Sequence, residues 1–144
     1  MEMTKFNKQF VERTKKIVHD YCTNGCEYDV TLLLNCLLGL VSLPIEQARV
    51  NEISFQNECV NKLELMRVLL RTSNDNKTFH SIKNALSHMY IDIENKHGIV
   101  ESVYFSDKRS NSNTNHTEMK FTIAQLKEFA LFVADKHLER VNNQ

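Results

Sequence analysis

The residues with the clearest potential for chemistry lie together in the segment Lys83-Asn84-Ala85-Leu86-Ser87-His88. The segment places a cation, an amide and an imidazole on one predicted helix, which we call the signature helix. Residues four apart share a helix face, so His80, Asn84 and His88 form a polar stripe. A solvated surface helix shows the same pattern, so that interpretation stays open. The opposite face is predicted to be buried and consists of Phe79, Ile82, Leu86, Met89 and Ile93.

These residue types suit the cleavage of RNA without a metal. The reaction needs a base near the 2′-hydroxyl, an acid at the leaving oxygen and a cation beside the phosphorane. Histidine suits the first two tasks because its pKa lies near neutrality, and lysine suits the third. Lys83 and His88 are five residues apart, about 140° around the helix axis at roughly 100° per residue. A site that uses both therefore needs one side chain to reach around the helix, or a second helix.

The segment resembles the signature of the HEPN superfamily, small helical domains that include many RNases. That signature is an Arg, usually followed by a polar residue, with a His about five to seven positions after the Arg. Lys83 stands at the Arg position, Asn84 is the polar neighbour and His88 is the signature His. The stretches 10–14 and 30–40 also look like the opening of a HEPN group carried on plasmids and other mobile elements.

The resemblance implies a mainly α fold, a HEPN-like up-and-down bundle of about four to five helices with a small β-hairpin before the last helix. It implies a metal-independent endoribonuclease that acts on RNA as a homodimer, in which signature helices from two subunits share a cleft. A toxin or defence effector of a mobile element is the expected role, with catalytic residues His88, Lys83 and Asn84. No cofactor is expected.

Lys83 leaves a second interpretation open. Lysine offers a point charge on a flexible stem, whereas arginine offers a planar fork that binds two phosphate oxygens. The alternative is therefore a catalytically weak HEPN domain that binds RNA, a nucleotide or a protein partner. A plain helical interaction module with no nucleic-acid role is a third interpretation.

Three further residues are candidates for binding substrate. His80 extends the polar stripe as an acid–base or RNA-contacting group, or is simply solvated. Tyr90 lies two positions after His88, where some HEPN toxins carry a Tyr that accepts nucleotidyl groups from an antitoxin nucleotidyltransferase; an ordinary interfacial Tyr is the alternative. Asn35 interrupts an apolar helix, so it either makes a structural hydrogen bond or lines the site. An antitoxin, either a protein or a nucleotidyltransferase, is a further implied partner.

Composition limits the classes of partner. The chain has 144 residues, which suits one domain over 1–144, and its 42% hydrophobic content is enough for one core. Its formal net charge is zero, so strong non-specific nucleic-acid binding is not expected and RNA contact must use a local patch. Residues 1–5 lack an apolar leader, and the apolar stretch 30–43, at about 14 residues, is too short to span a bilayer. We expect a cytoplasmic protein without membrane contact.

The four cysteines are expected to be buried, inert thiols rather than disulfides. His19, Cys22 and Cys26 have the i, i+3, i+7 spacing of a shared helix face, which could suggest a metal site. However, Asn24-Gly25 is predicted to end that helix, and no fourth ligand with suitable spacing is evident. We therefore expect no metal.

Apolar periodicity and turn residues give the expected elements. Helices are expected at about Phe6–Tyr21, Asp29–Pro44, Glu58–Arg71, Thr78–Ile93 and Ile123–Arg140, with a non-periodic connector over Pro44–Asn57. A hairpin is expected from two β-like runs near Val100–Tyr104 and Met119–Phe121, separated by the polar loop Ser106–Thr117. His97-Gly98 is expected to turn the chain.

Overall fold

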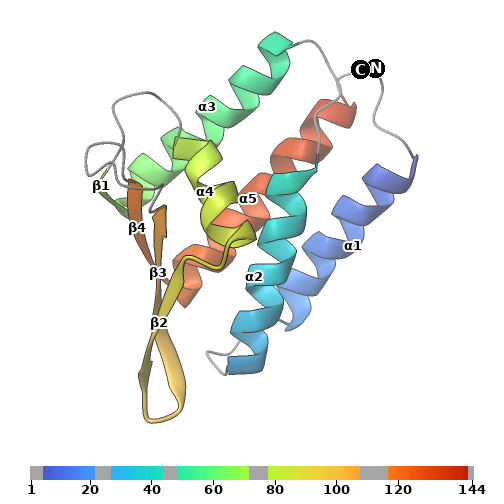
Figure 1. Ribbon diagram of the computed structural model, residues 1–144. Coiled ribbons are helices and arrows are strands. Elements are labelled where there is room, and N and C mark those ends of the chain that lie inside the picture. The colour runs from blue at the N-terminus through green and yellow to red at the C-terminus, as the bar shows by residue number, and fades with distance from the viewer. Residues whose placement is uncertain (1–4, 22–26, 44–48, 72–77, 108–116, 143–144) are drawn as a thin grey trace.

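The computed structural model describes residues 5–21, 27–43, 49–71, 78–107 and 117–142, which form helices packed against a sheet (Figure 1). The mainly helical class is confirmed. The helices are α1 (Lys5–Tyr21), α2 (Glu27–Ser42), α3 (Arg49–Met66), α4 (Thr78–Ser87) and α5 (Ile123–Asn142). The strands are β1 (Leu69–Arg71), β2 (Ile91–Lys96), β3 (Ile99–Asp107) and β4 (Thr117–Thr122).

The sheet is larger than the single hairpin predicted. It has four antiparallel strands in the order β1-β4-β3-β2. The predicted pairing of β3 with β4 is confirmed, with Phe105 opposite Met119. The turn at His97-Gly98 is also confirmed: both residues have positive φ, 55° and 78°, which suits a two-residue hairpin loop. That turn adds β2 as an edge strand, whose first three residues the sequence pattern had assigned to the signature helix.

Helix α5 packs across the inner face of the sheet and through the centre of the helices. Phe121 of β4 lies between Phe105 of β3 and Phe129 of α5, with ring centroids 5.4 and 6.0 Å away. The predicted inward residues of α5, Leu126, Phe129, Ala130 and Val133, are all fully buried. In Figure 1, α1, α2 and α5 lie side by side beyond the sheet.

A capping box explains why α5 begins at Ile123. The Thr122 N–H donates to Gln125 Oε1 at 3.0 Å, and the Gln125 N–H donates to Thr122 Oγ1 at 3.1 Å. These two bonds satisfy backbone donors that a helix start leaves without partners. The strand β4 therefore passes directly into α5 without a loop.

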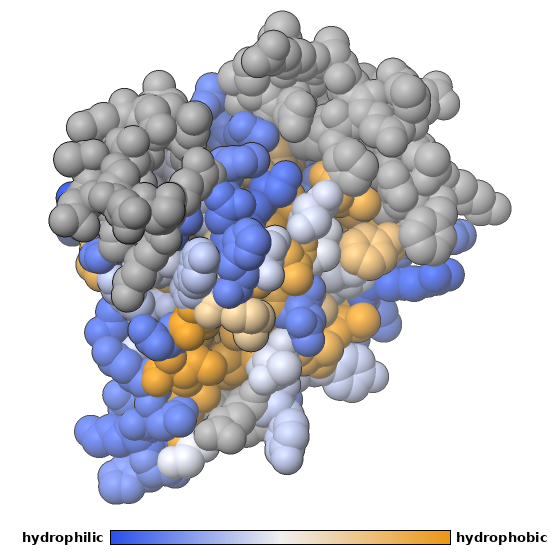
Figure 2. Space-filling view, viewed as in Figure 1, coloured by the Kyte–Doolittle hydropathy of each residue, from blue (hydrophilic) through white to orange (hydrophobic). Residues whose placement is uncertain are grey.

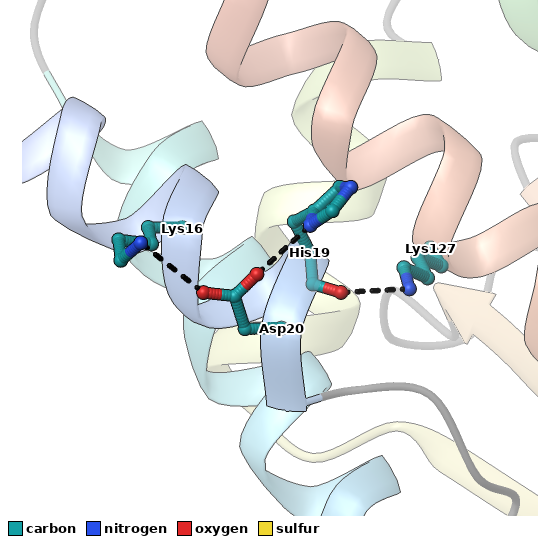
Figure 3. Close-up of polar contacts among 4 residues, drawn as sticks. All are labelled: Lys16, His19, Asp20 and Lys127. Carbon is teal, nitrogen blue, oxygen red and sulfur yellow. Dashed lines mark hydrogen bonds and ion pairs between the residues drawn. The ribbon is translucent and has the colours of Figure 1, made fainter.

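Side chains of α5 also bond carbonyls near the C-terminal ends of three of the four preceding helices, α1, α2 and α3. Lys127 Nζ donates to the His19 carbonyl of α1 at 3.2 Å (Figure 3). His137 Nε2 donates to the Leu40 carbonyl of α2 at 2.8 Å, and Gln125 Nε2 donates to the Met66 carbonyl of α3 at 3.4 Å. The last four carbonyls of a helix have no intrahelical partner, so α5 supplies hydrogen-bond donors for some of them.

Apolar spacing predicts that α1 faces the core with Phe6, Phe10, Ile17 and Tyr21; Phe10 and Ile17 do pack against the core, but Tyr21 does not. Val11 and Val18 are fully buried and Thr14 is nearly so, whereas Tyr21 is 65% exposed. Phe10 is half-buried because it packs against Gly39 of α2, where an added Cβ would lie 2.9 Å from the Phe10 ring. Gly39 thus lets α1 and α2 approach closely.

The bounds of α3 and α4 also correct the sequence analysis. Helix α3 starts at Arg49, inside the predicted connector, and ends at Met66 rather than Arg71. Helix α4 ends at Ser87 rather than near Ile93. The predicted helix end at Pro44, the turn at Asn24-Gly25 and most of the Ser106–Thr117 loop lie outside the described residues.

Cys36 and Cys59 are buried and form no disulfide within the described residues, as predicted, and burial raises the pKa of Cys36. Cys22 and Cys26 lie outside the described residues, and His19 Nδ1 donates to the Asp20 carboxylate at 2.9 Å. Within the described ranges, no three His, Cys, Asp or Glu side chains are grouped as metal ligands. None of the described helices is both long and apolar enough to cross a membrane.

Candidate functional site

The C-terminus of α4 is built as a Schellman motif. The Tyr90 N–H donates to the Ala85 carbonyl at 2.8 Å, and the Met89 N–H donates to the Leu86 carbonyl at 3.4 Å. Met89 has φ 59°, a left-handed conformation that glycine usually provides at this position. The chain therefore leaves the helix at His88 and enters β2 within three residues.

This turn explains the error in the predicted length of α4. A methionine in place of glycine gives no sign in the sequence that the helix ends. The apolar spacing up to Leu86 is confirmed, with Phe79, Ile82 and Leu86 at most 4% exposed. Met89 and Ile93, predicted to be buried, are 73% and 43% exposed.

The predicted polar stripe lies on the outward side of α4. His80 and His88 are exposed, and Lys83 and Asn84 are half-buried. The inward side is formed by residues that are 5% exposed or less: Thr78, Phe79, Ser81, Ile82, Ala85 and Leu86. Lys83 and His88 are not joined by a hydrogen bond or ion pair in the described part of the chain, so one copy of α4 does not bring them together.

His88 and Tyr90 are brought together by the turn. Their rings are stacked, with centroids 5.6 Å apart and planes at 27°. Tyr90 is 41% exposed, so part of its side chain remains accessible to solvent. The two aromatic side chains form one platform at the end of the signature helix.

Asn35 lies on α2 and is exposed, which corrects the prediction that it is buried. It lines an apolar groove of about 160 Å³ between α2, the end of α4 and β2. Figure 2 shows apolar side chains gathered in this region. We call it the apolar groove; its lining residues are Thr31, Leu34, Asn35, Leu38, Leu86, Met89, Ile91 and Ile93.

A second pocket lies beside the same turn. It has a volume of about 170 Å³ and is lined by Met89, Tyr90, Ile91, Asp92 and Ser106, and we call it the Asp92 pocket. The Ser106 N–H donates to the Tyr90 carbonyl at 3.1 Å, which fixes the pocket against β3. Asp92 and Ser106 were not predicted as site residues, because only the β2–β3 register brings them to one pocket.

The outer face of the sheet next to this pocket is acidic. Glu94 accepts hydrogen bonds from Ser102 at 2.9 Å and from Lys120 at 3.2 Å, and these lower its pKa. Burial, then a hydrogen bond to Glu118, raises the pKa of Tyr104. The charge of Asp92 adds to the rise.

His137, to which the sequence analysis gave no role, is 1% exposed. Its ring lies 4.7 Å from that of Phe55 of α3, and its Nε2 bonds the Leu40 carbonyl. It therefore connects α5, α3 and α2 inside the core. Its surroundings indicate a structural role.

The described residues form a mainly helical domain with a four-stranded antiparallel sheet. Comparison with known proteins identifies its family. A family model described as HEPN pEK499 p136 matches residues 1–144, and the chain belongs to this family. The resemblance to a plasmid HEPN group is thereby confirmed. No curated protein and no solved structure matches the chain.

Proposed function

We propose that this protein is a metal-independent endoribonuclease that acts as a homodimer, as a toxin or defence effector of a mobile element. HEPN domains are generally associated with RNase activity, and the family match supports this class. One observation carries the proposal. The signature residues Lys83, Asn84 and His88 lie on the outward side or at the end of α4, where RNA can reach them.

Each residue has a role that fits its chemistry. His88 takes the proton of the 2′-hydroxyl or gives one to the leaving oxygen. Lys83 places a positive charge beside the phosphorane, and Asn84 donates a hydrogen bond that orients the phosphate. His80, one turn earlier on α4, contacts RNA further along the strand. Tyr90 holds the His88 ring through stacking.

A homodimer supplies what one helix lacks. Lys83 and His88 point in directions about 140° apart on α4, and no bond joins them in the described residues. Met89 and Ile93 line the apolar groove beside the end of α4, and they are 73% and 43% exposed. A second copy that covers this groove would bring two α4 helices together. The shared cleft would then hold two imidazoles and two cations.

The test measures cleavage of a labelled RNA in chelator by the wild-type protein and by His88→Ala. We expect cleavage to be lost in His88→Ala while its circular dichroism and melting temperature are retained, because His88 is exposed. His97→Ala, in the exposed β2–β3 turn, is the matched control and should cleave normally. Cleavage retained in His88→Ala would contradict the proposal, as would light scattering that shows only monomers at tens of micromolar.

The second candidate is a HEPN domain that binds RNA, a nucleotide or a protein partner but cleaves weakly. It is favoured by Lys83, which cannot form the bidentate contact of an arginine. A nucleotidyltransferase antitoxin is one such partner, because Tyr90 is 41% exposed and its hydroxyl can be reached. A mass increase of one nucleotidyl group at Tyr90, lost in Tyr90→Phe, would support this candidate. RNA binding without cleavage would also favour it.

A further inference from the structure

The Asp92 pocket adjoins the apolar groove and shares Met89 and Ile91 with it. Successive side chains of a strand point to opposite faces, so Asp92 lies on the other face of β2 from Ile91 and Ile93. Asp92 is opposite Tyr104 of β3. The register therefore places an aromatic ring, a carboxylate and the small side chain of Ser106 around one space of about 170 Å³.

The wall formed by Tyr90 suits a planar ligand. One side of its ring stacks on His88, with centroids 5.6 Å apart, and the side chain is 41% exposed. Nucleic-acid bases stack on exposed aromatic rings, whatever the base. A base stacked on Tyr90 would be separated from His88 only by the Tyr90 ring. The phosphate of that nucleotide would then be within reach of His88, the proposed catalytic group.

The charge of the pocket decides which part of a nucleotide enters it. Asp92 is exposed and forms no ion pair with any other described residue. Glu94, Glu118 and Lys120 lie on the same face of the sheet, and Lys120 is hydrogen-bonded to Glu94. The carboxylate that lines the pocket itself is that of Asp92, so a phosphate is disfavoured inside the pocket. Lys83 of α4 is not among the residues that line the pocket. A nucleotide therefore enters with its base inward and leaves its phosphate outside the pocket, on the side where His88 stacks on Tyr90.

We infer that the Asp92 pocket binds a guanine base next to the cleaved phosphate of the RNA. A carboxylate only accepts hydrogen bonds, and guanine presents N1–H and the 2-amino group side by side on one edge. Adenine, cytosine and uracil each offer one donor group on the corresponding edge. Asp92 thus determines base preference and does not take part in the chemical step. This inference rests on the proposed ribonuclease activity.

The test compares the wild-type protein with Asp92→Asn and with Glu101→Gln. Glu101 is an exposed carboxylate on β3 outside the pocket, so its variant controls for the loss of one negative charge. Each protein cleaves an RNA pool with randomised bases in chelator, and the new ends are sequenced. We expect wild type and Glu101→Gln to favour guanine beside the cut by at least about tenfold. Asp92→Asn should lose that preference and cut other contexts at a rate within about threefold of wild type.

A binding measurement separates this inference from the proposed activity. GMP and AMP are titrated into labelled protein while the amide signals of Asp92 and Ser106 are followed by NMR. Selective shifts with GMP, absent in Asp92→Asn, support the pocket even if no RNA is cleaved, and then only the ribonuclease proposal fails. Cleavage without guanine preference, or with the same preference in Asp92→Asn, overturns the pocket and leaves the ribonuclease proposal intact. Equal binding of GMP and AMP also overturns it.

Discussion

The ring of Tyr90 lies against the ring of His88, with centroids 5.6 Å apart and planes at 27°. The contact exists because the Schellman turn at Met89 folds the chain back on the end of α4. A stacked neighbour limits the rotation of the imidazole. In the proposed reaction, Tyr90 would therefore position His88 for proton transfer.

Substitution of Tyr90 tests this role. Tyr90→Phe keeps the ring and should keep most RNA cleavage, whereas Tyr90→Ala should lose up to about tenfold, since an aromatic pair is worth about 0.5–1.5 kcal/mol. The measurement is single-turnover cleavage as a function of pH. A loss in Tyr90→Phe equal to that in Tyr90→Ala would assign the effect to the hydroxyl instead.

Lys83 is the second position to vary. Lys83→Arg should increase cleavage, because a planar fork orients its charge on the phosphorane better than an ammonium does. Lys83→Ala should lower cleavage by on the order of 10²-fold or more. Stability should change by less than about 1 kcal/mol, since Lys83 is only half-buried. Equal single-turnover rates for all three forms would indicate that Lys83 is a solvated surface cation. They would favour the second candidate, a HEPN domain that binds its partner but cleaves weakly.

The left-handed residue at the end of α4 predicts a stabilising substitution. Met89→Gly should raise the free energy of unfolding by about 1 kcal/mol, because glycine adopts φ 59° without the steric cost of a side chain. Arg67 ends α3 with the same φ, so Arg67→Gly is the matched variant. Met89→Ala removes the groove side chain but keeps the backbone cost and should not stabilise. Denaturant unfolding measures all three.

Buried His137 predicts a large loss of stability. His137→Ala removes the donor to the Leu40 carbonyl and leaves a cavity beside Phe55, so we expect a loss of about 2–4 kcal/mol. His19→Ala, at an exposed histidine, should change the free energy of unfolding by less than about 0.5 kcal/mol. Similar losses in the two variants would contradict the structural role of His137.

Asp20 predicts a small dependence of stability on pH. A hydrogen bond from His19, then one from Lys16, lowers its pKa below 3.8 (Figure 3). A carboxyl with a lowered folded-state pKa adds stability above its unfolded pKa, and that contribution is lost as the pH falls through the folded value. The melting temperature of Asp20→Asn should therefore be below that of wild type at about pH 6 and approach it at about pH 3. A difference that does not change with pH would contradict this.

The helices were predictable where apolar spacing and turn residues agree. Three helices match the predicted ones to within two residues at each end: Lys5–Tyr21, Glu27–Ser42 and Ile123–Asn142. The start of α3 at Arg49 was missed because residues 49–57 show little apolar periodicity. The β2 strand was missed because Ile91 and Ile93 extend the apolar spacing of α4, and no glycine or proline interrupts it.

The site was predictable only in part. The outward position of His80, Lys83, Asn84 and His88 follows from helix periodicity, which is a local property. The contact of Tyr90 with His88 depends on the left-handed conformation of Met89. A methionine gives no sign in the sequence that the backbone adopts this conformation. Asp92 and Ser106 meet through the β2–β3 register, which joins residues 14 positions apart in the sequence and has no local signal.

The dependence of α1, α2 and α3 on side chains of α5 also affects how the protein is made. Gln125, Lys127 and His137 supply donors to those three helix ends, and β4 precedes them directly. A ribosome that has not yet synthesised residues 117–137 therefore holds a chain whose earlier helices lack these contacts and whose sheet lacks a central strand. Helix α4 itself packs against α2, α3 and β3, so its own neighbours are already made while the sheet beside it is still incomplete.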